Sequence, residues 1–290
     1  MLRSLGRYNL RSSERWWSRA AAGELEPDQV DRTYNGIRMA DGVRKIGGDP
    51  TRLAEARLAL GSFHCYLELH IEQGAILDKE NTPVGVVEGI VSIDVHEVEI
   101  RGFANHAGTT PMPVRRNALL AAAKLIEAVQ DVVTLEPGRQ VGTVGWLQVF
   151  PNARNVIPGL VKLTIELRDL SAEKIAGLGE EIQQRAQAIA LETATEIVIR
   201  KVEHDPPAVA QPEIQTKIEE AAAQLRLKTI RLPSGAGHDA QMMARLGPMG
   251  MIFVPSAGGI SHSPREFTSW QDCANGADVL LHTLLLVDRT

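Results

Sequence analysis

The stretch HEVEIR at residues 96–101 decides the fold of the central part of the chain. Val98 and Ile100 alternate there with glutamates, and apolar side chains at every second position are typical of a strand that buries one face. We therefore expect a half-buried strand, and the segments that follow it can be read outward from this point.

These following segments alternate between helical and strand patterns. They are a helix over 117–133, strands over 143–150 and 161–167, a helix that Ser171 caps, and a strand over 196–202. The resulting order, β-α-β-β-α-β, is the ferredoxin-like pattern. A unit this complete can be a domain inserted between two parts of another, so we predict a domain over residues 94–205.

The flanking residues, 1–93 and 206–290, are predicted to form a second α/β domain. Its expected elements are a polar helical region over 18–60 that is broken at 47–50, a strand over 84–93, a helix over 212–227, a short strand over 229–232, a buried strand over 249–255 and a closing helix that contains 280–287. The fold class is therefore α/β.

The composition indicates which kinds of partner and which cellular compartment to expect. The formal net charge is -5, which gives no reason to expect nucleic acid or an anionic membrane as a partner. No apolar run approaches the roughly 18 residues of a membrane-spanning helix. Only two cysteines occur, Cys65 and Cys273, so we expect no disulfide framework and a reducing cytoplasm.

The first candidate site is ELHIEQG at residues 68–74. His70 follows an apolar strand-like run, where a metal ligand can be held rigidly, and Glu68 or Glu72 could orient its ring. The alternative is a histidine at a strand end that is satisfied by the backbone.

Three further places gather polar side chains beside small residues. They are the loop at 102–111 with His106, the segment at 152–158 followed by Arg168, and the glycine-rich loops at 234–240 and 258–266. Arg168 with Asn155 could bind a substrate carboxylate, and His262 is a second candidate metal ligand. The alternatives are ordinary loops, tight turns and a surface ion pair of Arg168 with a neighbouring carboxylate.

Taken together and in order, five strings resemble one family: ELHIEQG, GxxNHAGTTPM, FPNxxNVIPG, SGAGHDA and SHSPxE. They are similar to the amidase/hydantoinase/carbamoylase branch of the M20 metallopeptidase-like superfamily. That branch includes N-carbamoyl-L-amino acid amidohydrolases, allantoate amidohydrolases and β-ureidopropionases. The resemblance implies a zinc-peptidase-like catalytic domain with an inserted lid and dimerisation domain.

The resemblance also implies roles for individual residues. It implies two bridged divalent metals, with His70 as a ligand of one and His262 as a ligand of the other. Histidine and carboxylate ligands suit zinc, and they also suit manganese, cobalt and nickel. His106 resembles a lid histidine that reaches the partner subunit's active site and stabilises an oxyanion. The remaining implied substrate contacts are Gln73, Asn155, Arg168 and the backbone around Gly237. Four histidines match no motif and are interpreted as structural: His64, His96, His204 and His282.

The family's other metal ligands and its catalytic glutamate lie upstream of the position that matches Ser18. Met1 to Trp17 contains no histidine or aspartate, and Glu14 is its one acidic residue. This segment contains neither an H-x-D motif nor a paired Glu-Glu, so we expect a catalytic domain that lacks its N-terminal part and is inactive or impaired.

The function predicted from these features is hydrolysis of the C–N amide bond in small ureido or N-carbamoyl compounds, with a homodimer formed through the lid domain. Two alternatives stay open. One is a non-catalytic dimerisation or regulatory module, and the other is an aminoacylase- or dipeptidase-like hydrolase of the same superfamily.

Overall fold

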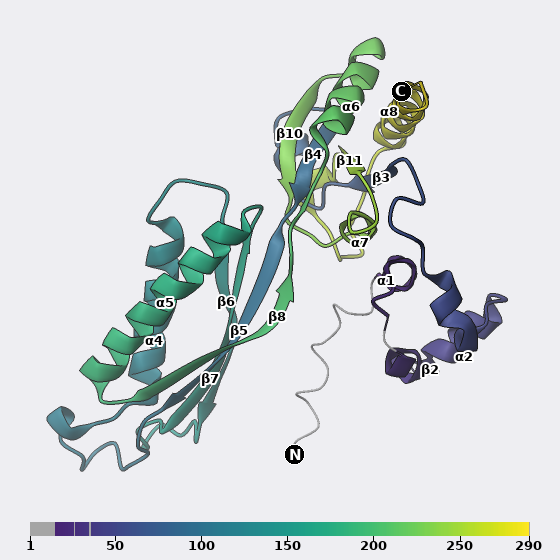
Figure 1. The fold of residues 1–290 in the computed structure, drawn as a ribbon. Coiled ribbons are helices and arrows are strands. Elements are labelled where there is room, and N and C mark those ends of the chain that lie inside the picture. Colours follow the sequence, from purple (N-terminus) through teal and green to yellow (C-terminus); the bar gives the residue numbers. More distant parts are fainter. Residues whose placement is uncertain (1–14, 26, 35, 290) are drawn as a thin grey trace. The chain divides into compact units, whose positions relative to one another are not determined.

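The computed structural model describes residues 15–25, 27–34 and 36–289 (Figure 1). It consists of two compact units: residues 91–207 form one, here called unit 2, and the described residues on either side form unit 1. The prediction of an α/β fold is confirmed. The roles assigned to the two predicted domains stay predictions, and the prediction about Met1 to Trp17 falls mostly on residues outside the described part.

Unit 2 has the element order βαββαβ that the sequence predicts. Its elements are β5 (Ser92–Arg101), η4 (Met112–Val114), α4 (Ala118–Thr134), β6 (Val141–Phe150), β7 (Leu160–Asp169), α5 (Ala172–Thr193) and β8 (Glu196–Asp205). The strands form an antiparallel sheet in the order β6-β7-β5-β8. Helices α4 and α5 lie side by side against this sheet (Figure 1).

The alternation in the sequence explains this packing. Val98 and Ile100 of β5 are buried at 2% and 0% exposure, and they belong to a core shared with both helices. Ser171 caps α5 as predicted, because its hydroxyl oxygen accepts a hydrogen bond from the backbone N–H of Lys174 at 3.1 Å. Asn117 caps α4 in the same way.

Unit 1 is built on a five-stranded mixed sheet. Its strands are β3 (Tyr66–Ile71), β4 (Val84–Ile90), β9 (Ala208–Val209), β10 (Thr229–Ser234) and β11 (Met249–Val254). The order is β10-β4-β11-β3, with β9 beside β4. All six residues of β11 are buried, which agrees with the buried strand predicted over 249–255. Among the described strands, β3 pairs with β11 alone, and its six residues are half-buried.

Helices cover both faces of this sheet. On one face, α6 (Pro212–Gln224) and α8 (Trp270–Val287) pack against Val86 and Ile252. On the other face, residues of α3 (Ile76–Lys79) and α7 (Asp239–Met243) pack against Phe253. A short helical turn, η5 (Ala257–Gly259), follows β11. None of the helices in the described part of the chain is both long and apolar enough to cross a membrane.

The prediction of a helical region over residues 18–60, broken at residues 47–50, is right in part and wrong in part. The structure has α1 (Trp16–Ala22), η2 (Pro27–Asp31), β1 (Thr33–Tyr34), β2 (Ile37–Arg38), α2 (Met39–Lys45) and η3 (Pro50–Ala56). The break lies between α2 and η3, but two short strands also occur. Gly36, between β1 and β2, has a φ of 80°, a conformation that glycine adopts without strain. The two short strands therefore interrupt a region whose polar composition alone favours helix.

Candidate active site

Three side chains at one end of β3 converge on a common point, and we call this group the metal cluster. Glu68 and His70 are two residues apart on β3, so their side chains lie on the same face of the sheet. His238 comes from the loop between β10 and α7. One ligand atom from each residue lies within 4.8 Å of the others. The rings of His70 and His238 meet edge to face, with centroids 4.5 Å apart.

The backbone fixes the tautomer of His70. Its Nδ1 lies 2.8 Å from the carbonyl oxygen of Ile71. Because a carbonyl oxygen can only accept a hydrogen bond, Nδ1 carries the proton of the neutral ring. The lone pair of Nε2 is therefore available to a metal, an arrangement in which a second partner orients the ligand.

His238 is held in a buried, neutral form. The residue is 4% exposed, and its Nε2 lies 2.7 Å from the hydroxyl oxygen of Ser234. Burial, with smaller effects from the charges of His70 and Arg15, lowers the pKa of His238 to about 3. A ring that stays neutral at ordinary pH keeps a lone pair that it can donate to a metal.

Glu68 is anchored by a neighbouring helix. One carboxylate oxygen accepts a hydrogen bond from the backbone N–H of Ala240 at 2.8 Å, and the other lies 3.7 Å from Nδ1 of His238. Burial raises the pKa of Glu68, while the N–H of Ala240 acts in the opposite direction. The first turn of α7 thus positions the carboxylate beside the two imidazoles.

The chemistry of this donor set fits a divalent metal. Two imidazoles and one carboxylate are a ligand set of catalytic zinc sites, which leave a further coordination position for water or substrate. Of these three residues, His70 was predicted from the sequence as a metal ligand, Glu68 was considered only as an orienting residue, and His238 was not predicted. The signal for His238 was its place in SGAGHDA, directly after the Gly237 that was assigned.

His262 lies near this group without being part of it. Its Nε2 is 3.4 Å from the side-chain nitrogen of Gln73, so the structure brings these two predicted residues together. Glu266 holds the loop, because one of its oxygens accepts from the His262 N–H at 3.0 Å and from the Ser261 hydroxyl at 2.8 Å. These two hydrogen bonds, with smaller effects from the charges of His262 and His70, lower the pKa of Glu266.

Helix α1 braces the loop that carries Gly237 and His238. The hydroxyl of buried Ser18 donates to one carboxylate oxygen of Asp239 at 2.6 Å, and the indole N–H of Trp17 donates to the other at 2.7 Å. Gly237 itself is exposed, and a Cβ added there would stand 3.5 Å from the Arg15 guanidinium. The described part of α1 therefore contacts the segment next to the metal cluster.

The other predicted residues lie in unit 2. His106 is exposed, and its loop pairs with the loop after β6: the N–H of Ala107 donates to the carbonyl oxygen of Asn155 at 2.9 Å. Arg168 lies near the far end of β7 and forms an ion pair with Glu166 at 2.6 Å. The structure thus brings His106 and Asn155 together. It also contains the surface ion pair that was the alternative reading of Arg168.

Within one chain, Asn155 and Arg168 do not meet. The loop of Asn155 precedes Leu160, the first residue of β7, and Arg168 is eight residues further along the strand. At about 3.3 Å per residue, this separation is roughly 26 Å.

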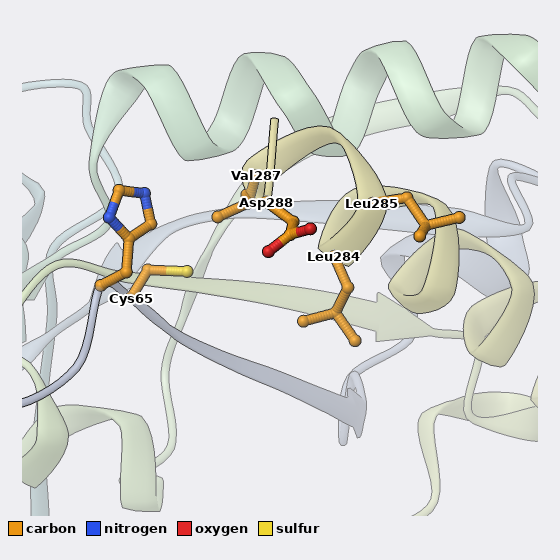
Figure 2. A pocket seen from close by; sticks show the side chains of 6 residues that line it. Cys65, Leu284, Leu285, Val287 and Asp288 are labelled. Atoms are coloured by element: carbon orange, nitrogen blue, oxygen red, sulfur yellow. The ribbon is translucent and has the colours of Figure 1, made fainter. Parts of the chain in front are cut away.

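A groove of about 570 Å³ lies elsewhere in unit 1, between the start of β3 and the end of α8 (Figure 2). It is lined by His64, Cys65, Leu284, Leu285, Val287 and Asp288. Cys65 precedes β3, whereas His70 is near the strand's opposite end, so this groove and the metal cluster are separate. Burial raises the pKa of the Cys65 thiol, which leaves it a weak nucleophile.

Comparison with known proteins identifies the family of the chain. Residues 38–286 match the model of peptidase family M20/M25/M40, and the chain belongs to this family. The family is metal-dependent, in agreement with the metal cluster. The resemblance stated from the sequence motifs is confirmed.

Two relatives and one solved structure show where the chain stands within the family. It is 41% identical over 268 residues to an N-carbamoyl-L-amino acid amidohydrolase of Geobacillus stearothermophilus, covering 92% of this chain and 65% of that protein. It is 42% identical over 276 residues to a ureidoglycolate hydrolase of Arabidopsis thaliana, covering 92% and 58%. A hydantoinase/carbamoylase family amidase from Burkholderia multivorans superposes with a TM-score of 0.83 at 32% identity, covering 93% and 66%. The chain therefore spans about two thirds of the length of such relatives or less.

Proposed function

We propose that this chain acts as a metal-dependent amidohydrolase on small N-carbamoyl or ureido compounds, cleaving a linear C–N amide bond. One observation carries the proposal: Glu68, His70 and His238 form a ligand set within 4.8 Å in a chain 41% identical to an N-carbamoyl-L-amino acid amidohydrolase. The substrate class rests on the names of that relative and of the ureidoglycolate hydrolase.

The residues of the cluster would hold a divalent ion, zinc by preference or else manganese, cobalt or nickel. Such an ion supplies Lewis-acid chemistry, because it polarises a carbonyl group and makes water more acidic. His70 offers Nε2, since its Nδ1 proton is donated to Ile71. His262, beside Gln73, is proposed as a ligand of a second ion whose other ligands are not among the described residues.

Among the described residues, the metal cluster contains one carboxylate, that of Glu68. If Glu68 binds the ion, it cannot also take a proton from the attacking water. A general base contributes about 100-fold or more to such a reaction. We therefore propose that this chain hydrolyses its substrate at least about 100-fold more slowly than the Geobacillus relative.

His106 and Asn155 are proposed to contact the substrate from unit 2, which would act as a lid and dimerisation domain. Arg168 is proposed to bind the substrate carboxylate after leaving its ion pair with Glu166. The separation of roughly 26 Å along β7 means that one substrate could meet Asn155 and Arg168 only if two copies of the chain each gave one residue. This geometry supports the proposal of a homodimer.

The test begins with metal content. The purified chain is stripped with a chelator, dialysed against trace zinc or manganese, and measured by elemental analysis. We expect at least one ion per chain, loss of this ion in His70→Ala, and retention in His282→Ala. His282 is a suitable control because it lies on α8, hydrogen-bonded to Gln224 at 3.3 Å, away from the cluster.

Ammonia release from an N-carbamoyl amino acid and from ureidoglycolate then tests the reaction. Slow release that requires the metal and disappears in His70→Ala supports the proposal. A metal-loaded chain that releases no ammonia from either compound contradicts the proposed activity and favours a non-catalytic module.

A further inference from the structure

The loop at residues 105–110, which we call the His106 loop, folds its backbone around its own imidazole. The N–H groups of Gly108 and Thr109 both point at Nδ1 of His106, at 3.0 and 3.2 Å. The ring lies so close to the chain that a Cβ added to Gly108 would stand 3.1 Å from the ring carbon Cε1. A glycine at this position therefore lets the ring approach the backbone.

These contacts decide which ring nitrogen carries a proton. Nδ1 faces two N–H donors, so it must use its lone pair as an acceptor. In the neutral ring the proton then lies on Nε2. Among the residues that the structure describes, none accepts a hydrogen bond from this Nε2–H. His106 is exposed, so the group can donate to an oxygen atom of a bound molecule.

Arg115, whose side chain lies outside the turn, bridges two carbonyl groups of the loop. The half-buried guanidinium of Arg115 donates to the carbonyl oxygen of Ala107 at 2.5 Å and to that of Thr110 at 2.9 and 3.0 Å. These two carbonyls flank the pair of N–H groups that hold Nδ1. Because the fork of a guanidinium is planar and rigid, it fixes the distance between the two carbonyls, which an ammonium group cannot do.

We propose that Arg115 is a positioning residue for His106: it holds Ala107 and Thr110 together, so that the loop locks His106 as a donor through Nε2–H. The ligand class that fits this donor is a carbonyl oxygen or oxyanion of an amide or ureido group. The inference rests on the proposed function for the identity of the substrate. The tautomer and the part played by Arg115 rest on the geometry of the loop alone.

The neighbouring arginine provides a matched control. The Nε of Arg116 donates to the carbonyl oxygen of Ala194 at 2.7 Å, at the end of α5 and away from the loop. Replacing Arg115 or Arg116 by lysine therefore makes the same chemical change at adjacent positions, and only the first removes the fork between Ala107 and Thr110.

The experiment is a long-range ¹H–¹⁵N spectrum of the full chain labelled with ¹⁵N-histidine, which reports the protonated nitrogen of each ring. His106→Gln identifies the His106 signals by their disappearance. The wild-type chain should show His106 as a single Nε2–H tautomer, and Arg115→Lys should move its two nitrogens toward the average of both tautomers. Arg116→Lys should leave them unchanged.

Gly108→Ala gives a second route to the same result without altering Arg115. The added methyl group should displace the ring from its two N–H donors and shift the same signals. Signals of His96 and His204 on β5 and β8 report whether unit 2 stays folded in each variant. A wild-type chain with the proton on Nδ1, or an Arg115→Lys chain with the wild-type tautomer, overturns the proposal.

The hydrolysis assay separates this inference from the proposed function. If the wild-type chain hydrolyses a ureido compound, Arg115→Lys should lower kcat roughly 100-fold with little change in KM, because a small displacement of a donor is felt in the transition state. An active wild-type chain with an unaffected Arg115→Lys variant contradicts the role of Arg115 alone. A wild-type chain without hydrolysis contradicts the proposed function, and the tautomer measurement still decides the role of Arg115.

Discussion

The metal cluster and the His106 loop both present imidazole rings, but contacts of different kinds build them. In the cluster, Glu68 accepts a hydrogen bond from Ala240, which is 172 residues further along the chain. In the loop, His106 is held by N–H groups two and three residues away, and Arg115 reaches carbonyls five and eight residues away. One arrangement depends on the fold of all of unit 1, and the other is largely local.

Burial adds a second difference. His238 is 4% exposed, and the loss of water around it lowers its pKa to about 3. His106 is exposed, and hydrogen bonds from the backbone rather than burial set its tautomer. The protonation of a histidine ring can therefore be set by burial, as in His238, or by hydrogen bonds within its own turn, as in His106. The two residues should respond differently to acid and to mutation.

The largest expected effect is on the acid stability of unit 1. The pKa of His238 is about 3 in the folded chain and near 6.5 when unfolded, so between these values only the unfolded state takes up the proton. The contribution of His238 to stability is therefore complete above pH 6.5 and falls as the pH decreases toward 3. At about 1.4 kcal/mol per pH unit, a change from pH 7 to pH 5 should cost about 2 kcal/mol.

Hydrogen exchange of unit 1 peptides in the metal-free, chelator-treated chain measures this effect. His238→Gln should remove most of the difference between pH 7 and pH 5, whereas His106→Gln should leave it as in the wild-type chain. An equal loss of stability in wild-type and His238→Gln chains would show that burial of this ring does not cause the acid sensitivity.

A smaller effect should follow from removing the brace between α1 and α7. Ser18 is fully buried, and its hydroxyl donates to the charged carboxylate of Asp239 at 2.6 Å. Ser18→Ala should destabilise unit 1 by about 1.5 kcal/mol, the lower end of the range for a hydrogen bond to a charged group. Urea unfolding measures the loss, and faster exchange of α7 peptides locates it.

Thr216→Ala serves as the control for this variant, because the exposed Thr216 hydroxyl donates to the carbonyl oxygen of Pro212 in its own helix, α6. We expect at most about 0.5 kcal/mol from that change. If Ser18→Ala had no larger effect than Thr216→Ala, α1 would not stabilise the segment next to the metal cluster. That part of the contrast with the local His106 loop would then fail.

The elements predicted correctly from the sequence are those with local signals. The alternation around Val98 and Ile100 identified β5, and Ser171 marked the start of α5, because period and capping depend on residues a few positions apart. The helical prediction over 18–60 was wrong at 33–38. The prediction there relied on polar composition and did not consider the turn between β1 and β2 that Gly36 makes possible.

The candidate site was predicted from the sequence only in part, for a physical reason. His70 was predicted as a metal ligand because it follows an apolar run and stands in a motif. Its grouping with Glu68 and His238 depends on the fold of the loop after β10. The spacing of these three residues along the chain does not predict that they lie close together. The roles of His262, Asn155 and Arg168 stay predictions. The structure adds that the last two lie far apart along β7.

The smallest expected effect tests how local the His106 loop is. Asn117 caps α4 just after the loop, and its side-chain oxygen accepts from the N–H groups of Leu119 and Leu120 at 3.0 and 3.3 Å. Asn117→Ala should destabilise unit 2 by about 1 kcal/mol, and Asn117→Ser should restore most of this loss. Hydrogen exchange of α4 peptides measures both variants.

The ring nitrogens of His106 should keep their wild-type signals in Asn117→Ala, because Arg115 and the loop's own N–H groups hold the ring without help from the helix cap. A shift like that expected for Arg115→Lys would show that the loop takes its geometry from α4. In that case both imidazole sites would depend on tertiary structure, and the contrast between a local site and a fold-dependent one would fail.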